Sequence, residues 1–181
     1  MDMATKTLLT VEEFLRLPDS VGNRDVRYEL VEGELVTVSP GMLPHNLIRD
    51  AILTVLRAFV MSRRLGTAVS EQAFHLFANT VRVPDVAFIC TGRPLASDAP
   101  IEGAPDLAVE VMSPTNTPRE IDQRISDYFA AGCRRVWVVY PEDREVYVHG
   151  LAGVTRRRGD DLLEDAELLP GFSVKVSELF V

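Results

Sequence analysis

Two carboxylates interrupt segments that otherwise resemble buried β-strands. Residues 82–89 run Arg-Val-Pro-Asp-Val-Ala-Phe-Ile with Asp85 in the middle, and residues 106–112 run Asp-Leu-Ala-Val-Glu-Val-Met with Glu110 in the middle. Because burying an unpaired charge costs free energy, the fold must supply a partner to each side chain. A divalent cation with oxygen ligands, such as Mg²⁺, would serve both. The alternatives are that both carboxylates face solvent at strand ends or pair with arginine.

The length and composition favour one soluble domain over residues 1–181. With 46% hydrophobic residues, a chain of 181 residues can bury a single sizeable core without disulfides or structural metal. Two cysteines are too few for a secreted disulfide framework, so we expect a reduced, cytoplasmic protein. The chain has no apolar run of about 20 residues, and residues 1–10 lack the apolar core of a signal peptide, so we expect no membrane partner.

The net charge of −8 argues against a protein that coats nucleic acid without specificity, because such binding needs many Lys and Arg contacts to phosphate. It does not exclude a small acidic site that holds a cation. The only two lysines, Lys6 and Lys175, lie near the ends of the chain. Any reaction carried out here must therefore do without a central lysine.

Three segments predict helices. A capping box at residues 10–13 predicts a short helix that runs to about Leu17. After Pro44, apolar residues recur at helical spacing until Gly66. A second capping box at residues 117–120, with proline at the first helical position, opens a helix that Gly132 ends.

Alternating apolar residues and turn signals predict the strands. A hairpin is expected over residues 26–38, and a second one over residues 135–149. Further strands are expected at residues 67–70, 73–77, 81–89, 106–112 and 172–176. This order of elements predicts an α/β (α+β) fold with a mixed central sheet flanked by helices.

The ordered series of motifs resembles the PD-(D/E)XK nuclease superfamily and, within it, the Uma family of "putative restriction endonucleases". The resemblance is carried by Pro84-Asp85 and by Glu110-Val111-Met112-Ser113-Pro114. Further matches extend over most of the chain, at residues 28–33, 39–40, 105–107 and 170–172 and at His45, Tyr128, Gly132, Trp137 and Pro141. It implies a restriction-endonuclease-like fold with N-terminal and C-terminal hairpins.

What the resemblance implies for function is a metal-dependent endonuclease that hydrolyses DNA. Asp85 and Glu110 would hold Mg²⁺ or Mn²⁺, together with a backbone carbonyl near Val111. Glu29 matches the family's upstream acid and would bind metal through water or hold a second ion; the alternative is a solvated strand glutamate. His45 matches the family's histidine and would bind a water or phosphate oxygen, because the start of a helix tends to keep an imidazole neutral. Its alternative is a hydrogen bond to a loop.

The chain departs from the superfamily at its lysine. Residues two apart share a face of a strand, and the lysine expected two positions after Glu110 is Met112. In Uma-like sequences the lysine often lies on the following helix, at the position matching Arg124. That position belongs to the inward stripe of this helix, so we expect its guanidinium to reach the carboxylates or the scissile phosphate. The alternative is that Arg124 snorkels or pairs with Glu120.

Two other functions stay open from the sequence. The first is a noncatalytic binding module that keeps the nuclease fold, which would bind substrate without turnover and gain activity on Arg124→Lys. The second is a structural protein whose strands build a homodimer, in which Asp85→Asn would change no activity. A homodimer is expected in every case, because restriction-type enzymes often pair two active sites across a duplex.

Overall fold

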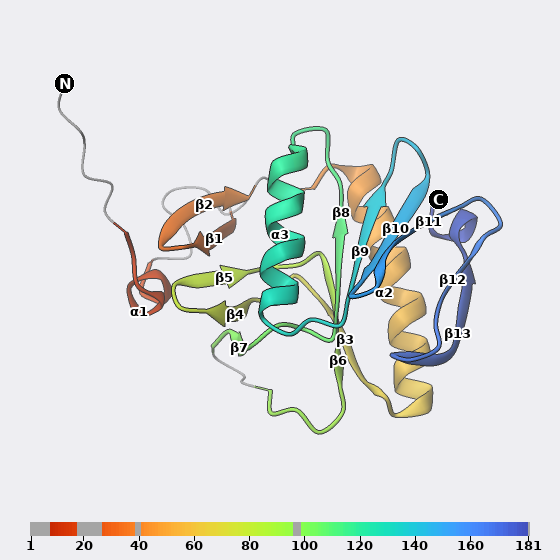
Figure 1. The fold of residues 1–181 in the computed structure, drawn as a ribbon, viewed down its shortest axis with the longest axis horizontal. Helices are drawn as coiled ribbons and strands as arrows, with labels where there is room; N and C mark the ends of the chain where they lie inside the picture. Colours follow the sequence, from red (N-terminus) through yellow and green to blue (C-terminus); the bar gives the residue numbers. More distant parts are fainter. Residues whose placement is uncertain (1–7, 18–26, 39–40, 96–98, 181) are drawn as a thin grey trace.

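The computed structural model describes residues 8–17, 27–38, 41–95 and 99–180 (Figure 1). Residue 26, where the first hairpin was expected to start, and residues 39–40, which belong to the family resemblance, therefore lie outside the described part of the chain. Within it, the α-helices are α1 (Val11–Leu15), α2 (Leu43–Arg63) and α3 (Pro118–Ala130), and a 3-10 helix covers Val176–Leu179. None of these helices combines the length and the apolar composition needed to cross a membrane.

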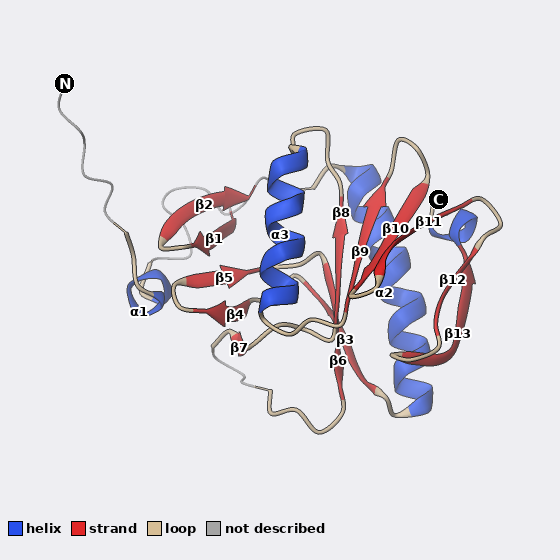
Figure 2. Ribbon diagram, in the orientation of Figure 1, coloured by secondary structure: helices blue, strands red, loops and turns tan. Residues whose placement is uncertain are grey.

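A mixed six-stranded sheet forms the centre of the molecule (Figure 2). Its strand order is β11 (Gly153–Arg158), β10 (Glu145–Gly150), β9 (Arg135–Tyr140), β8 (Leu107–Val111), β6 (Val86–Cys90) and β3 (Gly66–Ser70). The central pair β8 and β9 is parallel, whereas the other neighbours are antiparallel. The expected hairpin over residues 135–149 is confirmed as β9 and β10.

Helices cover the two faces of this sheet. On one face α2 and the C-terminal strands β12 (Leu162–Asp165) and β13 (Leu169–Lys175) share a core with Val109, Trp137 and Val139. On the other face α3 packs through Ile121 and Tyr128 against Ala108, Val136 and Val138. The predicted fold class, a mixed sheet flanked by helices, is confirmed.

A second sheet lies beside the first and carries the N-terminal hairpin (Figure 1). Its strand order is β2 (Glu34–Val38), β1 (Arg27–Val31), β5 (Thr80–Arg82), β4 (Phe74–Phe77) and β7 (Ile101–Glu102). Strand β1 pairs with β2 in the register that places Glu29 opposite Val36. The strands β7, β11 and β12 were not predicted, because they are short or exposed and lack a regular apolar alternation.

The prediction of one strand over residues 81–89 is wrong. The segment forms β5 in the five-stranded sheet and β6 in the six-stranded sheet, with residues 83–85 between them. Pro84 accounts for the break, because proline has no N–H to donate to a strand ladder. Asp85 therefore lies at the junction of the two sheets instead of inside a strand.

The longest helix, α2, follows its predicted pattern. Its buried residues Ile48, Ile52, Leu56 and Val60 recur every fourth position. The helix ends at Arg64, whose φ of 55° is left-handed, and the chain then enters β3 at Gly66. A Cβ atom at Gly66 would lie 2.0 Å from the carbonyl oxygen of Ile89, so only glycine allows this close approach.

Truncating the buried face of α2 should destabilise the whole domain. We expect Leu56→Ala to lower the free energy of unfolding by about 2–5 kcal/mol, because it leaves a cavity in a close-packed core. The control Met61→Ala, at a side chain that is 65% exposed on the same helix, should change it by less than about 0.5 kcal/mol. Urea unfolding measures both values, and equal losses would contradict this assignment of the core.

Candidate functional site

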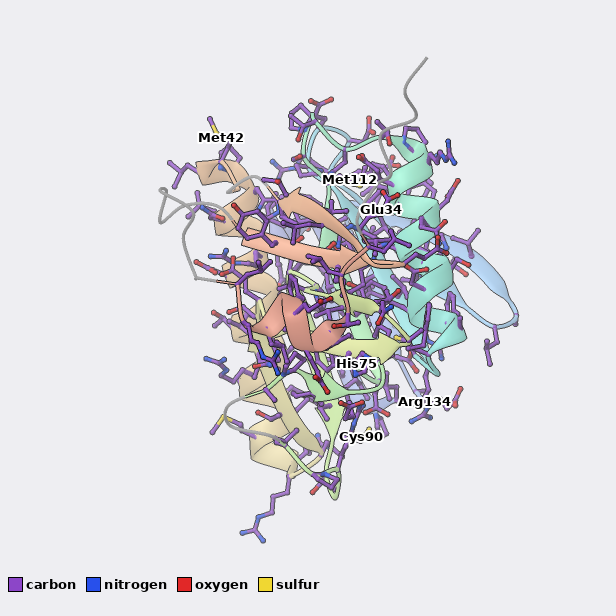
Figure 3. The ribbon with its side chains drawn as sticks, turned by 90° about the vertical axis from the view of Figure 1, so that its left-hand side faces the viewer. Glu34, Met42, His75, Cys90, Met112 and Arg134 are labelled. Atoms are coloured by element: carbon purple, nitrogen blue, oxygen red, sulfur yellow. The ribbon has the colours of Figure 1, made fainter. Side chains whose placement is uncertain are left out.

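A cleft of about 770 Å³ opens where the two sheets meet α3. Its lining comes from five stretches of chain: β1 and β2, the start of α2, the junction between β5 and β6, the end of β8, and the first half of α3. Figure 3 labels Glu34 and Met42, which line this cleft, and Met112, which follows β8. The cleft brings together residues that are far apart in the sequence, from Val31 to Arg124.

Asp85 anchors the floor of the cleft to the end of β8. Its Oδ2 accepts a hydrogen bond of 2.7 Å from the backbone N–H of Val111. The same oxygen lies 3.3 Å from Nε2 of His45, on the first turn of α2. Because the chain breaks after β5, Asp85 lies against Val111, the residue that follows Glu110.

Glu110 is the most perturbed carboxyl group of the cleft. Its Oε1 accepts a hydrogen bond of 2.6 Å from the buried hydroxyl of Tyr128 and one of 3.2 Å from Nη1 of Arg124. Burial raises the pKa of Glu110 to about 7; the Arg124 charge opposes this shift, while Asp85 and Glu29 reinforce it. Close to neutral pH this carboxyl group therefore exchanges between its protonated and its charged form.

Glu29 is fully buried, so the alternative of a solvated strand glutamate is wrong. Its Oε2 accepts a hydrogen bond of 3.0 Å from Nη1 of Arg82. Its Oε1 accepts one of 2.9 Å from the N–H of Val83 and one of 2.8 Å from Nη1 of Arg124. Both carboxylate oxygens of Glu29 are therefore already engaged by donors of the protein.

Arg124 joins Glu29 to Glu110, as the inward stripe of α3 predicts. Its side chain is 11% exposed. Burial lowers the pKa of Arg124, but the charges of Glu110 and Glu29 raise it by more. The pKa of Arg124 therefore lies well above its usual value. The alternative partner Glu120 instead accepts hydrogen bonds from Thr117 at the start of the helix.

The carboxylate of Asp85 opposes the expected tendency of His45 to stay neutral at the start of α2. Burial lowers the pKa of His45, but the hydrogen bond and the charge of Asp85 raise it by more, and the net pKa is above the ordinary value. The nearby carboxylate thus outweighs the dipole at the start of α2.

Two residues of this network, Arg82 and Asp127, were missed in the sequence. Arg82 is 5% exposed and donates from Nε and Nη2 to Oδ2 of Asp127, at 2.9 and 2.6 Å. The other oxygen of Asp127 accepts a hydrogen bond of 2.8 Å from Nε2 of Gln123. The signal for Arg82 was present, since it is a charged residue beside a buried apolar run, as Asp85 is.

The arrangement of oxygens shows which residues fit a cation. Among the described residues, Oδ1 of Asp85 and Oε2 of Glu110 accept no hydrogen bond. Mg²⁺ commonly binds one or two carboxylates and keeps several waters, so these two oxygens fit it. No group of three or more His, Cys, Asp and Glu side chains converges as a full ligand set in the part of the chain that the structure describes.

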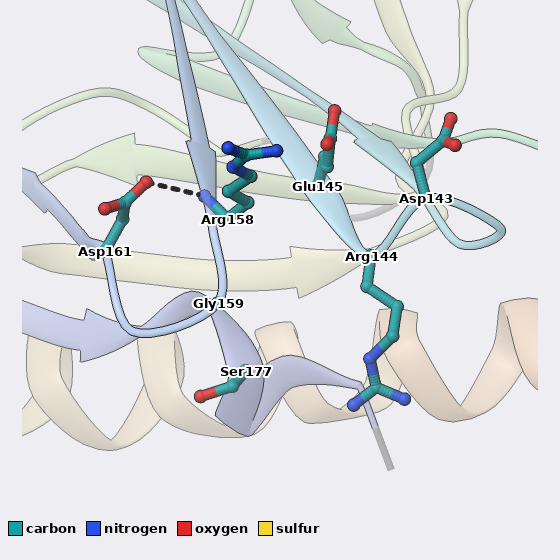
Figure 4. Close-up of a pocket in the computed structure, with 7 residues that line it drawn as sticks. All are labelled: Asp143, Arg144, Glu145, Arg158, Gly159, Asp161 and Ser177. Atoms are coloured by element: carbon teal, nitrogen blue, oxygen red, sulfur yellow. Dashed lines mark hydrogen bonds between the residues drawn. The ribbon is translucent and has the colours of Figure 1, made fainter.

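A second pocket, of about 430 Å³, lies away from these residues at the turn between β9 and β10 (Figure 4). Some of its charged groups already have partners in the protein. Arg144 donates to the carbonyl of Phe180 at 2.9 Å, and Asp161 accepts from the N–H of Arg158 at 2.9 Å. The pocket contains none of the predicted site residues, so the cleft remains the candidate site.

Comparisons with known proteins give a family and a similar fold. The Uma2 family, described as "Putative restriction endonuclease", matches residues 11–177. The fold is similar to the crystal structure of "a putative nuclease belonging to DUF820" from Anabaena variabilis, with a TM-score of 0.82 and 22% sequence identity. That match covers 95% of this chain and 97% of the other. The search of curated proteins found no match.

The raised pKa of Glu110 predicts how stability depends on pH. A carboxyl group whose pKa is higher in the folded than in the unfolded protein keeps a proton that unfolding releases. The free energy of unfolding of the wild type should therefore fall, relative to Glu110→Gln, as pH rises from about 4.5 to about 7, by up to about 3 kcal/mol. Urea unfolding across this pH range measures the difference.

The exposed Glu164 provides the control for this experiment. Glu164→Gln should follow the wild type at every pH, because its side chain gains no buried partner. A difference between wild type and Glu110→Gln that stays constant from pH 4.5 to 7 would contradict the proposed environment of Glu110.

Proposed function

Because the chain belongs to the Uma2 family of "putative restriction endonucleases", we propose that it is a metal-dependent endonuclease that hydrolyses phosphodiester bonds in DNA. The observation that carries the proposal is that Asp85 and Glu110 line one cleft, each with one oxygen left without a hydrogen bond. Bound there, Mg²⁺ or Mn²⁺ would polarise the phosphodiester and lower the pKa of an attacking water.

Three groups of the chain would hold this cation. They are the carboxylates of Asp85 and Glu110 and the backbone carbonyl of Val111. The N–H of Val111 faces Asp85, and in a strand the carbonyl of the same residue points to the same side. A cation would also compensate the negative charge of Asp85 and Glu110, which the buried arginines leave in excess.

Glu29 acts in this proposal through Arg124 instead of as a metal ligand. Three donors already occupy its oxygens, and a direct metal bond would cost at least one of these contacts. Glu29 holds the guanidinium of Arg124 at the cleft, where Arg124 binds the phosphate and stabilises the charge that develops on it.

In the part of the chain that the structure describes, no lysine lines this cleft. Arg124 stays protonated and cannot serve as a general base. His45 shares its Nε2 with Asp85 and is the titratable imidazole of the cleft. In the proposed reaction it holds a proton at Nε2 and orients a water or phosphate oxygen.

Metal titration tests the proposal without a choice of DNA substrate. Calorimetry should show binding of Mn²⁺ to the wild type, and Asp85→Asn and Glu110→Gln should each weaken it by at least about tenfold, because each removes a charged ligand. The control is Glu120→Gln, which changes a cleft carboxylate whose hydrogen bonds go to Thr117. Equal affinities for all four proteins, or no binding to the wild type with DNA present, would contradict the proposal.

A noncatalytic DNA-binding module is the second candidate, and one observation favours it. Met112 packs with the core on the α3 side of the sheet, so the position of the superfamily's lysine offers no charge to the cleft. For this candidate, Mn²⁺-dependent cleavage is absent in the wild type and appears in Arg124→Lys. For the leading proposal, the wild type cleaves DNA and Asp85→Asn does not. We also propose a homodimer, which analytical ultracentrifugation tests.

A further inference from the structure

Arg82, which lines the cleft, forms a buried ion pair with Asp127 of α3. We propose that these two residues are positioning residues of the site: Asp127 holds Arg82, Arg82 holds Glu29, and Glu29 holds Arg124 beside Glu110. The inference rests on the proposed function, because it takes Arg124 and Glu110 as the groups that act on the phosphate.

The contact between Arg82 and Asp127 is the most constrained of the three. Two nitrogens of Arg82 donate to the same oxygen of Asp127, and Gln123 donates to the other oxygen. The side chains of Arg82 and Asp127 are each 6% exposed. Water therefore does not compete for these bonds, and the guanidinium plane of Arg82 is fixed by residues of α3.

The second contact fixes the orientation of Glu29. Nη1 of Arg82 donates to Oε2 of Glu29, while the N–H of Val83 donates to Oε1. These two donors come from adjacent residues at the end of β5. They hold the carboxylate so that Oε1 faces Arg124.

The third contact transfers this orientation to the cleft. Nη1 of Arg124 lies 2.8 Å from Oε1 of Glu29 and 3.2 Å from Oε1 of Glu110. The same nitrogen therefore interacts with two carboxylates. A small change in the position of Glu29 alters how closely Arg124 approaches each carboxylate, and with it the positive charge near Glu110.

The charges of the network make the role of Asp127 specific. The three carboxylates of Glu29, Glu110 and Asp127 face the two guanidinium groups of Arg82 and Arg124. If Asp127 is replaced by asparagine, Nε and Nη2 of Arg82 keep only a neutral amide oxygen as their acceptor, which binds a guanidinium more weakly than a carboxylate does. Glu29 is the other carboxylate in contact with Arg82, so it would turn toward Arg82 and release Arg124 to Glu110.

The ion pair also joins separate parts of the fold. Arg82 belongs to β5 of the five-stranded sheet, whereas Asp127 belongs to α3, which packs on the six-stranded sheet. The cleft lies between these parts, so the Arg82–Asp127 contact sets their spacing at the site.

The test follows the Nε–H signal of Arg124 in ¹⁵N NMR spectra, assigned from its loss in Arg124→Lys. Asp127 binds Arg82 and Gln123 and not Arg124 among the described residues, yet Asp127→Asn should shift this signal and weaken Mn²⁺ binding by about tenfold. Asp127→Glu, which keeps the carboxylate, should restore part of both effects. Gln123→Leu removes a single donor to Asp127 and provides a milder variant if Asp127→Asn fails to fold.

The control breaks a similar ion pair elsewhere in the chain. Arg135 and Asp165 form a two-contact pair with the Asp165 side chain 4% exposed, at the start of β9 and away from the cleft. Asp165→Asn should destabilise the protein but leave the Arg124 signal and the Mn²⁺ affinity unchanged.

The results separate this inference from the proposed function. If Asp127→Asn and Gln123→Leu lower stability and leave the Arg124 signal in its wild-type position, the positioning role is wrong. If the wild type binds no Mn²⁺, the proposed function fails, but the shift of the Arg124 signal still decides whether Arg82 and Asp127 position that side chain.

Discussion

The site depends on the balance of charge inside a buried cluster. Glu29, Glu110 and Asp127 lie in the interior, and the two guanidinium groups of Arg82 and Arg124 compensate them. Without such partners, buried carboxylates would either take up a proton or lower the free energy of unfolding. The excess of negative charge falls on Glu110 and on Asp85 beside it; burial, reinforced by the charges of Asp85 and Glu29, raises the pKa of Glu110. In the proposed function, a cation at the open end of the cleft would balance this negative charge.

The break at Pro84 explains how the fold delivers Asp85 to this place. One continuous strand would have placed Asp85 within a single sheet. Instead, the chain leaves one sheet after Arg82 and enters the other at Val86, so three of the four residues 82–85 serve the site. Arg82 binds Glu29 and Asp127, the N–H of Val83 binds Glu29, and Asp85 binds the end of β8. A proline at this position therefore has a structural role in assembling the site.

Much of the site was predictable because its charged residues interrupt apolar patterns. Asp85 and Glu110 stand in apolar runs, Arg124 lies in an inward helical stripe, and the structure brings all three to one cleft. The burial of Glu29 was not predictable, because the alternation of a hairpin does not show which face another element covers. Asp127 was missed because its partner Arg82 is 45 residues away, and no local pattern reports such a pair. Strands β11 and β7 were also not predicted, because β11 is exposed, β7 has only two residues, and neither shows an apolar periodicity.

The most direct test of the central claim is the position of a bound cation. A crystal of the protein soaked in Mn²⁺ should give an anomalous scattering peak between Oδ1 of Asp85 and Oε2 of Glu110, with Glu29 still bound to Arg82 and Arg124. A peak on Glu29 with Arg124 displaced, or no peak at Asp85 and Glu110 at saturating Mn²⁺, would contradict the assignment of the cation site.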